Sequence, residues 1–396
     1  MPENAVASPS AFRVLPVVLE SGERLPCLVH SADWLPARVA TRWAVRHRRY
    51  RVQSSTLADN LRILGRLYSW ALLRISVDLD DFLTSGRLLG SREIESFTAE
   101  LRSTGGPAPL DTGGFDHALA VVEDFLGWSL DATNRGGSGG LSLERLDAQR
   151  NRLHQIFRSL HIGAQPAQRI QPLEEAEVTA IRKAIGPFGT SADWEFPSVF
   201  APHARLRNWL MFEVALQLGI RRGELLKLRL DSLPRGASDG ILILRRPDDP
   251  HDSRPREPAV KTAERVIPAS RELLATIRAY LTYPAPTGRT AGKSPYLFVA
   301  RSGAPLSSDR ADDVIVAIGR HSGVKPLSWH RLRHTWAERM AEILLDLPNG
   351  MDRLVYLGGW TNPASAKRYI ERAIARQAEA SVRDYQRKLY EFGEAK

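Results

Sequence analysis

The C-terminal half of the chain holds residue types that together could transfer a phosphodiester bond. A tyrosine stands nine residues after a tryptophan, a His-x-x-Arg lies about thirty residues upstream, and an Arg-x-x-Glu lies further upstream. In chain order the set is Arg221, Glu224, His330, Arg333, Trp360 and Tyr369. A tyrosine hydroxyl can attack phosphorus, and arginine forks can hold the negative charge that builds on the phosphate oxygens. Because a covalent link to the protein conserves the broken bond, such chemistry needs no ATP.

The first pair is predicted to lie at a helix start. Gly219 permits a tight turn after an apolar helix, so Arg221 should open a new helix. Glu224 is three residues further on, on the same face, and can hold the arginine fork in place. The alternative is an ordinary surface ion pair, because Arg-x-x-Glu is a common pattern.

The second pair also lies at a predicted helix start, which Ser328 can cap. The i, i+3 spacing of His330 and Arg333 directs both side chains from one face, so both can reach one phosphate. His334 shares that face and is a rival for the same contact. A single histidine on a helix is more often a core residue, and only its pairing with Arg333 argues otherwise.

Around Trp360 and Tyr369 the sequence predicts another helix start. Asn362 can cap this helix, with Pro363 at its first position. The indole N–H of Trp360 is a donor without acid–base function, which suits a phosphate oxygen, whereas the alternative is simple core packing. The nearest other tyrosines are Tyr356, Tyr385 and Tyr390, and none has the nine-residue spacing.

In type, order and spacing, these motifs resemble the tyrosine site-specific recombinases of the phage integrase family. The motifs are Gly-x-Arg-x-x-Glu-Leu at 219–225, His-x-x-Arg-His-Thr at 330–335 and Gly-Gly-Trp-Thr-Asn at 358–362. Most members carry histidine where Trp360 stands, and tryptophan there is a Cre-like feature. The resemblance is strong over about 205–372 and only architectural over 36–162.

The resemblance implies a role for each residue. Tyr369 would attack the scissile phosphate and form a 3′-phosphotyrosyl link, while His334 would be structural. Glu224 would orient the arginines. The phosphate contacts would come from Arg221, His330, Arg333 and Trp360. No metal or other cofactor is implied.

A lysine is expected to protonate the leaving 5′ oxygen, because family members carry one on a β-hairpin. Lys261 lies in 260–268, a polar turn bounded by β-branched residues, which predicts a hairpin. The nearest other lysines, Lys227 and Lys293, are not on such a turn. Residues 245–258 enlarge the preceding loop and depart from the compact family pattern.

Composition agrees with a polyanion as the partner. The chain has 396 residues, a net charge of +10 and a pI of about 9.9, with arginine far more frequent than lysine. A single cysteine, Cys27, excludes an internal disulfide or a cysteine-based zinc finger. The sequence shows no membrane-length apolar run and no secretory signal pattern, so a cytoplasmic, nucleoid-associated location is expected.

Four parts are predicted along the chain. Residues 1–35 are irregular or short-strand material of unknown role, and 36–162 form a helical core-type DNA-binding domain. In it, Ser55 or Thr56 can cap a helix that runs toward Leu73. Residues 163–172, with two prolines and no periodicity, are the linker, and 173–396 form the catalytic domain with a C-terminal helix.

The start of the helical domain is strongly basic. Five arginines are candidates to track a phosphate backbone, and the alternative is a solvated basic face. They are Arg42, Arg46, Arg48, Arg49 and Arg51.

The overall prediction is a mainly α protein with a small β-sheet, whose two domains clamp double-stranded DNA at recombination sites. The family implies a homotetramer on synapsed DNA, with a dimer at each site and no membrane partner. A type IB topoisomerase would use the same chemistry, and a catalytically silent DNA-binding accessory protein is a further alternative. Phage and genomic-island integrases, transposon recombinases and dimer resolvases share this pattern.

Overall fold

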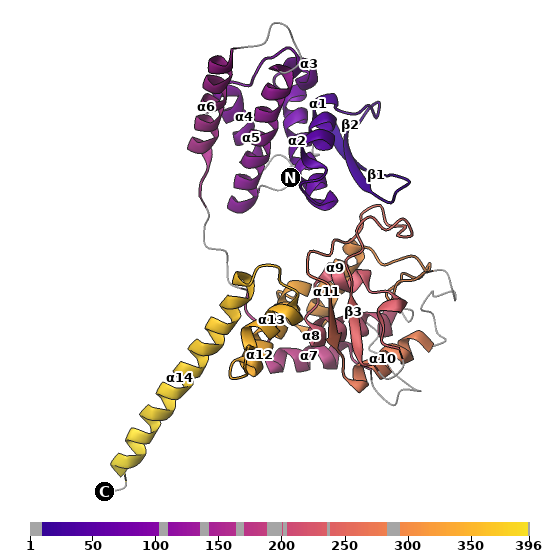
Figure 1. The fold of residues 1–396 in the computed structure, drawn as a ribbon, viewed down its shortest axis with the longest axis vertical. Helices are drawn as coiled ribbons and strands as arrows, with labels where there is room; N and C mark the ends of the chain where they lie inside the picture. The colour runs from indigo at the N-terminus through magenta and orange to yellow at the C-terminus, as the bar shows by residue number, and fades with distance from the viewer. Residues whose placement is uncertain are drawn as a thin grey trace, which may run out of the picture. The chain divides into compact units, whose positions relative to one another are not determined.

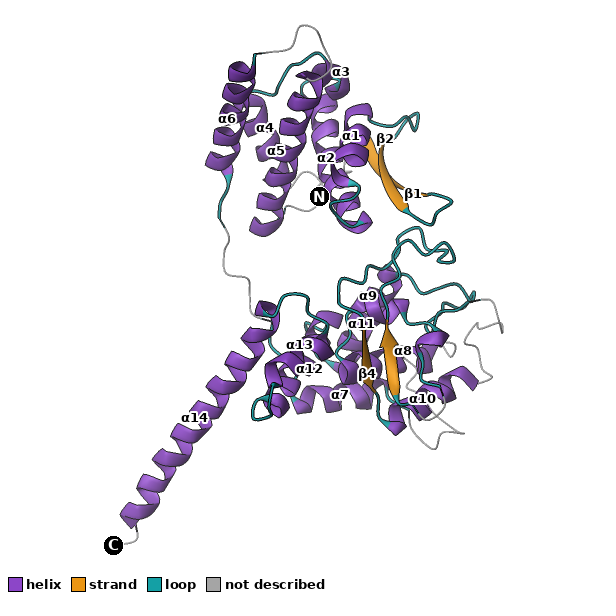
Figure 2. Cartoon of the chain, viewed as in Figure 1, coloured by secondary structure: helices purple, strands orange, loops and turns teal. Residues whose placement is uncertain are grey.

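The computed structural model describes residues 10–102, 110–134, 142–163, 170–187, 200, 204–235, 238–282 and 294–394. The chain divides into two compact units, residues 1–168 and 169–396 (Figure 1). The division falls within 163–172, the predicted linker. Helices dominate both units, and each unit carries one two-stranded sheet (Figure 2). The predicted mainly α fold class is confirmed.

A β-hairpin opens the described part of the first unit. Strands β1 (Phe12–Val18) and β2 (Arg24–His30) pair antiparallel, with Leu15 opposite Cys27. Leu28 is fully buried in the same core as helix α2 (Ser54–Arg74). The hairpin therefore belongs to the compact unit formed by the helices that follow it.

The first unit is otherwise helical. Its other helices are α1 (Arg38–Trp43), the π-helix η1 (Ala44–Arg48), α3 (Leu79–Thr84), α4 (Ser91–Arg102), α5 (Thr112–Asn134) and α6 (Leu143–Leu160). The apolar stripe of α2 at steps of three and four residues is buried as its periodicity predicts. The expected cap is wrong: α2 begins at Ser54 after Gln53, so Ser55 and Thr56 lie within its first turn.

The second unit packs helices around one main apolar core. They are α7 (Glu175–Ile185), α8 (Arg205–Leu218), α9 (Arg222–Lys227), the 3-10 helix η3 (Leu230–Ser232), α10 (Arg271–Thr282), α11 (Ser308–Ser322), α12 (Trp329–Leu344), α13 (Gly350–Gly358) and α14 (Ala364–Glu394). Helix α8 is buried on nearly every side, so it is the central element of this unit. Within the described ranges, no helix combines the length and apolar composition that crossing a membrane requires.

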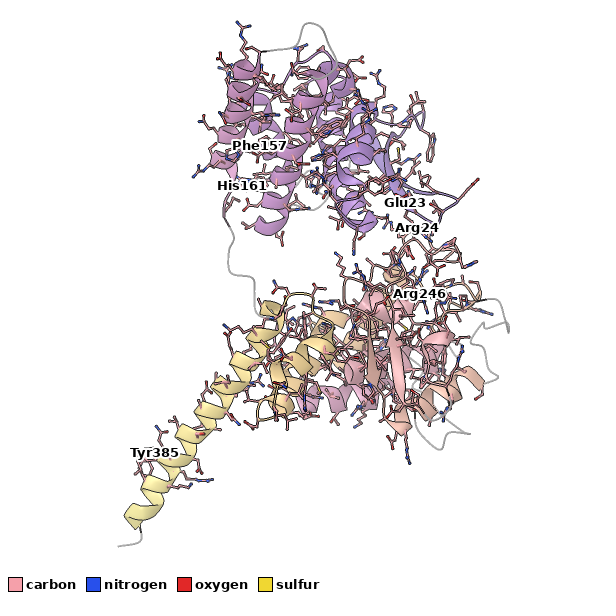
Figure 3. The ribbon with its side chains drawn as sticks, in the orientation of Figure 1. Glu23, Arg24, Phe157, His161, Arg246 and Tyr385 are labelled. Atoms are coloured by element: carbon pink, nitrogen blue, oxygen red, sulfur yellow. The ribbon has the colours of Figure 1, made fainter. Side chains whose placement is uncertain are left out.

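Strands β3 (Gly240–Ile243) and β4 (Arg265–Pro268) pair antiparallel across a long connection. The expected tight hairpin within 260–268 is therefore replaced by a loop that starts after Ile243, includes Arg246 (Figure 3) and reaches β4. Buried charges anchor this loop. The ammonium of Lys227 pairs with Glu257, and Arg254 donates to the carbonyl oxygen of Leu226 at 3.1 Å.

Helix α14 has two different halves. Its first part packs on α12 and α13, and Arg372 pairs with the buried Glu338 at 2.6 Å. Gln377 donates to Asp346 at 3.2 Å and is the last residue with a described hydrogen bond or ion pair outside the helix. Beyond it the helix extends away from its unit, with Val382, Tyr385 and Leu389 exposed (Figures 1 and 3).

Candidate active site

Arg221 and Glu224 lie where α8 turns into α9. Gly219 ends α8 with a left-handed φ of 61°, and Arg221 is the N-cap residue of α9. The Arg221 backbone N–H donates to Oε2 of Glu224 at 2.6 Å. Glu224 was expected to hold the arginine fork, but it contacts the Arg221 backbone instead, which leaves the Arg221 guanidinium available for another partner.

Glu224 is a buried carboxylate that binds the β3–β4 connection. Its Oε1 accepts from the hydroxyl of Thr262 and from Nη1 of Arg265, the latter at 2.6 Å. Although burial raises the pKa of Glu224, the hydrogen bond and positive charge of Arg265 lower it below its usual value. Glu224 is therefore ionised and fixes the loop that carries Lys261 against α9.

Arg265 was missed by the sequence reasoning. Its side chain is fully buried, and besides Glu224 it donates from Nε to the carbonyl oxygen of Leu357 at 2.7 Å. Its partner Glu224 is 41 residues away, so no local spacing marks the contact. Only the arginine's place at the start of a strand-like segment could have drawn attention to it.

Arg333 connects the ends of two helices under the site. It donates to the carbonyl oxygen of Gly219 at 2.7 Å and to that of Gly358 at 2.6 Å. Burial and the positive charge of Arg221 lower the pKa of Arg333 to about 9. Its guanidinium also lies 4.6 Å from the ring centre of Trp360.

Three arginines contact one buried carboxylate, Arg221 through its backbone N–H and the other two through their guanidinium groups. Burial and the charge of Arg265 lower the pKa of Arg221, and Nη1 of Arg221 is buried without a hydrogen-bond partner among the described residues. Oε2 of Glu224 is 4.0 Å from Nη1 of Arg333. The negative charge of one carboxylate cannot neutralise three guanidinium groups. The cluster therefore has excess positive charge, which a bound anion would neutralise.

The turn after α13 explains the paired glycines. Gly359 has a left-handed φ of 62°, and a Cβ there would collide with the guanidinium of Arg265. Its carbonyl oxygen accepts from the backbone N–H of Ala263 at 3.2 Å, which holds the lysine loop at this turn. Trp360 follows, mostly buried, with its ring 5.7 Å from that of Tyr369. Its indole N–H has no hydrogen-bond partner among the described residues. The ring therefore packs in the core while its N–H is available to a phosphate oxygen.

Tyr369 is the sixth residue of α14 and is only 1% exposed. Its hydroxyl is 2.9 Å from Nδ1 of His334 and accepts from Nη2 of Arg368 at 2.9 Å. Nε2 of His334 is in turn 3.0 Å from Nε2 of His330. The structure thus brings His334, the rival of His330, into direct contact with the tyrosine hydroxyl.

Lys261 is exposed, and the described structure gives it no hydrogen bond or ion pair. Its neighbour Thr262 is fully buried against Glu224, so the backbone of this segment is fixed although the lysine side chain is not held. The exposed amine of Lys261 can therefore move toward an anionic substrate bound at the arginines around Glu224.

The five N-terminal arginines separate into two groups. Arg49 forms a double hydrogen bond to Glu23 in the hairpin at 2.6 and 2.5 Å, and Arg48 lies 3.9 Å from Asp124. Three others line a groove of about 890 Å³ between η1, α5 and α6, and the described residues offer them no ion pair. These are Arg42, Arg46 and Arg51.

Comparisons with known proteins relate the second unit to a protein family and the fold to solved structures. Residues 199–376 match the phage integrase family. The fold resembles XerH site-specific recombinase bound to difH substrate, at 15% identity and a TM-score of 0.52, covering 83% of this chain and 78% of that one. It also resembles the Tn1549 transposon integrase in complex with transposon right end DNA, at 14% identity and a TM-score of 0.52, covering 87% and 99%. No curated protein matches the chain.

The matched residues include every predicted catalytic position. The second unit thus contains a region that matches the phage integrase family over residues 199–376, and its fold is one that XerH recombinase and the Tn1549 integrase share.

Proposed function

We propose that this enzyme carries out site-specific recombination of duplex DNA through a 3′-phosphotyrosyl intermediate, without metal or ATP. The supporting observation is that the buried guanidinium groups of Arg265 and Arg333 lie at the carboxylate of Glu224, with the half-buried Arg221 and a buried tyrosine hydroxyl beside them. A scissile phosphate is the anion that such a cluster would bind, and the tyrosine is the nucleophile that would attack it.

Each residue has a distinct part in the proposed reaction. Tyr369 attacks phosphorus, and the negative charge that builds on the phosphate oxygens is held by Arg221, His330, Arg333 and Trp360. Glu224 and Arg265 hold the α9 start and the lysine loop in position. Lys261 protonates the leaving 5′ oxygen, for which its exposed amine is suited.

The DNA partner is proposed to be a duplex recombination site held by both units. In the solved structures, XerH is bound to difH substrate, and the Tn1549 integrase is in complex with transposon right end DNA. The unpaired arginines of the first-unit groove are suited to the phosphate backbone. For strand exchange between two sites, four protomers would assemble, with a dimer at each site. We place this assembly at the nucleoid, where the DNA is.

The test is a duplex nicked near the scissile phosphate, which traps the covalent intermediate. Wild-type protein should form an adduct in excess EDTA, because arginines and lysine supply the charge that a metal would. Tyr369→Phe should bind the duplex but form no adduct, while the matched control Tyr385→Phe, at an exposed tyrosine of α14, should react normally. An adduct with Tyr369→Phe, or one that needs magnesium, would rule the proposal out.

A further inference from the structure

The nucleophile is not free in this structure but is the first group of a hydrogen-bonded chain. Its hydroxyl contacts Arg368 and Nδ1 of His334, and Nε2 of His334 contacts Nε2 of His330. Tyr369 and His334 are 1% and 4% exposed, whereas His330 is exposed. The chain therefore leads from the buried hydroxyl to a histidine at the surface of the site.

One tautomer of His334 lets a proton pass along this chain. A guanidinium can only donate, so the Tyr369 oxygen accepts from Arg368, and in that tautomer the hydroxyl proton points to Nδ1 of His334. His334 must then carry its proton on Nε2 and donate to Nε2 of His330. Nδ1 and Nε2 of His334 and Nε2 of His330 then each have one partner and one role.

Helix α12 makes this arrangement possible. His330 and His334 are four residues apart and share one face of the helix, with their rings 4.4 Å apart. The hydroxyl reaches them from α14, which packs along α12. No other described hydrogen-bonding side chain besides Arg368 contacts the hydroxyl, so His334 is the one available acceptor for its proton.

We propose that His334 relays the proton of Tyr369 to His330 during DNA cleavage, an inference that rests on the proposed function. As the tyrosine oxygen bonds to phosphorus, its O–H bond breaks and an N–H bond forms at Nδ1 of His334. The Nε2–H bond of His334 breaks, and an N–H bond forms at Nε2 of His330. His330 becomes an imidazolium beside the scissile phosphate, and rejoining returns the proton along the same path.

The electrostatics favour a relay over a simple base. Burial and the neighbouring His330, with the charges of Arg368, Arg372 and Arg333, lower the pKa of His334 to about 3, so it is a poor resting place for a proton. A relay never makes His334 cationic, because it gains one proton as it loses another. Partial loss of hydration and the charge of Arg333 lower the pKa of His330, and a bound phosphate would offset that positive charge.

The test compares variants in single-turnover cleavage of the nicked duplex. His334→Asn can still accept from the hydroxyl but cannot relay, so cleavage should slow by about 10²–10⁴-fold, the usual range for proton transfer in catalysis. His321→Asn, on an exposed histidine of α11, is the matched control and should cleave at the wild-type rate. Wild-type rates with His334→Asn would overturn the relay.

Fluorinated tyrosine at position 369 separates proton transfer from packing. Ring fluorine makes the phenol more acidic, so it should speed cleavage by His334→Asn, which lacks the relay, and should not speed cleavage by the wild type. A structural role for His334 predicts the same response in both proteins, and that result would overturn the proposal. Absence of any adduct with wild-type protein would instead reject the proposed function.

A second measurement needs no variant, in case His334→Asn does not fold. With sulfur replacing the bridging 5′ oxygen, the leaving group needs no proton, so only the nucleophile's protons move. A relay moves two protons at once, and the cleavage rate should then fall along a curve as the deuterium fraction of the solvent rises. A straight line means one proton in flight and would contradict the relay.

Discussion

At the scale of single residues, the site contains more arginines than carboxylates, and its buried guanidinium groups bind Glu224 and backbone carbonyl oxygens. Arg333 binds two backbone carbonyls, and Arg265 binds Glu224 and the carbonyl of Leu357. These planar forks each hold two points of the fold at once, which the single ammonium of a lysine cannot do. The arginines therefore stabilise the structure of the site and also make it positively charged.

The proposed acid role of Lys261 can be separated from the nucleophile's role. Lys261→Ala should cleave ordinary DNA about 10²–10⁴-fold more slowly, because the 5′ alkoxide leaves poorly without a proton. With sulfur as the bridging 5′ atom, the leaving group needs no proton, and cleavage by Lys261→Ala should recover. Tyr369→Phe should stay inactive on both substrates.

The outcome of this comparison is informative in each direction. Equal rescue of both variants would be incompatible with Tyr369 as the nucleophile. No rescue of Lys261→Ala would assign the acid role to another group, and Lys227 is excluded as a replacement because it is buried in an ion pair with Glu257.

Buried His334 should also make the protein sensitive to mild acid. Its pKa is lowered to about 3 in the folded state, so between pH 6.5 and 5 the unfolded chain binds a proton that the folded chain does not. The free energy of unfolding should therefore decrease as the pH is lowered from 6.5 to 5. The contribution of His334 to this decrease is up to about 2 kcal/mol. Urea unfolding at both pH values measures the change, and His334→Asn should show a smaller loss. An equal loss in both proteins would contradict the assignment.

At the scale of elements, three chain turns converge on the site. The α8–α9 turn supplies Arg221, the α13–α14 turn supplies Trp360, and the β3–β4 connection supplies Lys261. Buried polar contacts through Glu224 and Arg333 join these turns. Helix α14 carries Tyr369, the proposed nucleophile, in its docked half and an exposed apolar stripe in its distal half.

The distal half of α14 is predicted to act between protomers. Truncation after Gln377 keeps the part of α14 that contacts Glu338, Glu342 and Asp346, so folding and single-site DNA binding should be retained. Synapsis of two sites should be impaired, because the exposed stripe at Val382, Tyr385 and Leu389 needs an apolar partner. Native gel assays of binding and synapsis measure both.

A matched control uses the full-length helix. Changing Tyr385 and Leu389 to glutamate should reproduce the synapsis defect, while changing the exposed Arg383 and Lys388 to glutamine should not. Unchanged recombination by the truncated protein would refute an intersubunit role.

At the scale of the whole molecule, nearly all of the net charge of +10 lies in the second unit, while the first unit has a groove lined by both arginines and carboxylates. Binding to duplex DNA should release counterions from each neutralised phosphate, so the logarithm of the affinity should fall linearly with the logarithm of salt concentration. A flat plot would rule out DNA as the main partner.

The arginines of the first unit refine this prediction. Arg46→Ala should reduce the steepness of the salt dependence by about 1, the effect of one lost phosphate contact. Arg49→Ala is the matched control, since its guanidinium is already paired with Glu23, and it should change the steepness less. The opposite ranking would move the DNA contact to the hairpin side of the unit.

The local parts of this protein follow from its sequence alone. Arg221 opens α9, Ser328 caps α12 by accepting from the Arg331 N–H, and the leucine stripe of α2 is buried. Each depends on residues within about one or two helical turns, where backbone geometry and side-chain periodicity decide the outcome. The residue types that make up the site were predictable for the same reason.

Only the tertiary structure decided how those residues contact one another. Arg265 meets Glu224 across 41 residues, Arg333 meets the carbonyl of Gly219 across 114, and Tyr369 meets His334 across 35. The family resemblance implied a structural role for His334, and no local pattern distinguishes a packing histidine from one that faces a hydroxyl. Such contacts depend on how whole helices pack, and packing is set by the shape of the entire core rather than by any short stretch of chain.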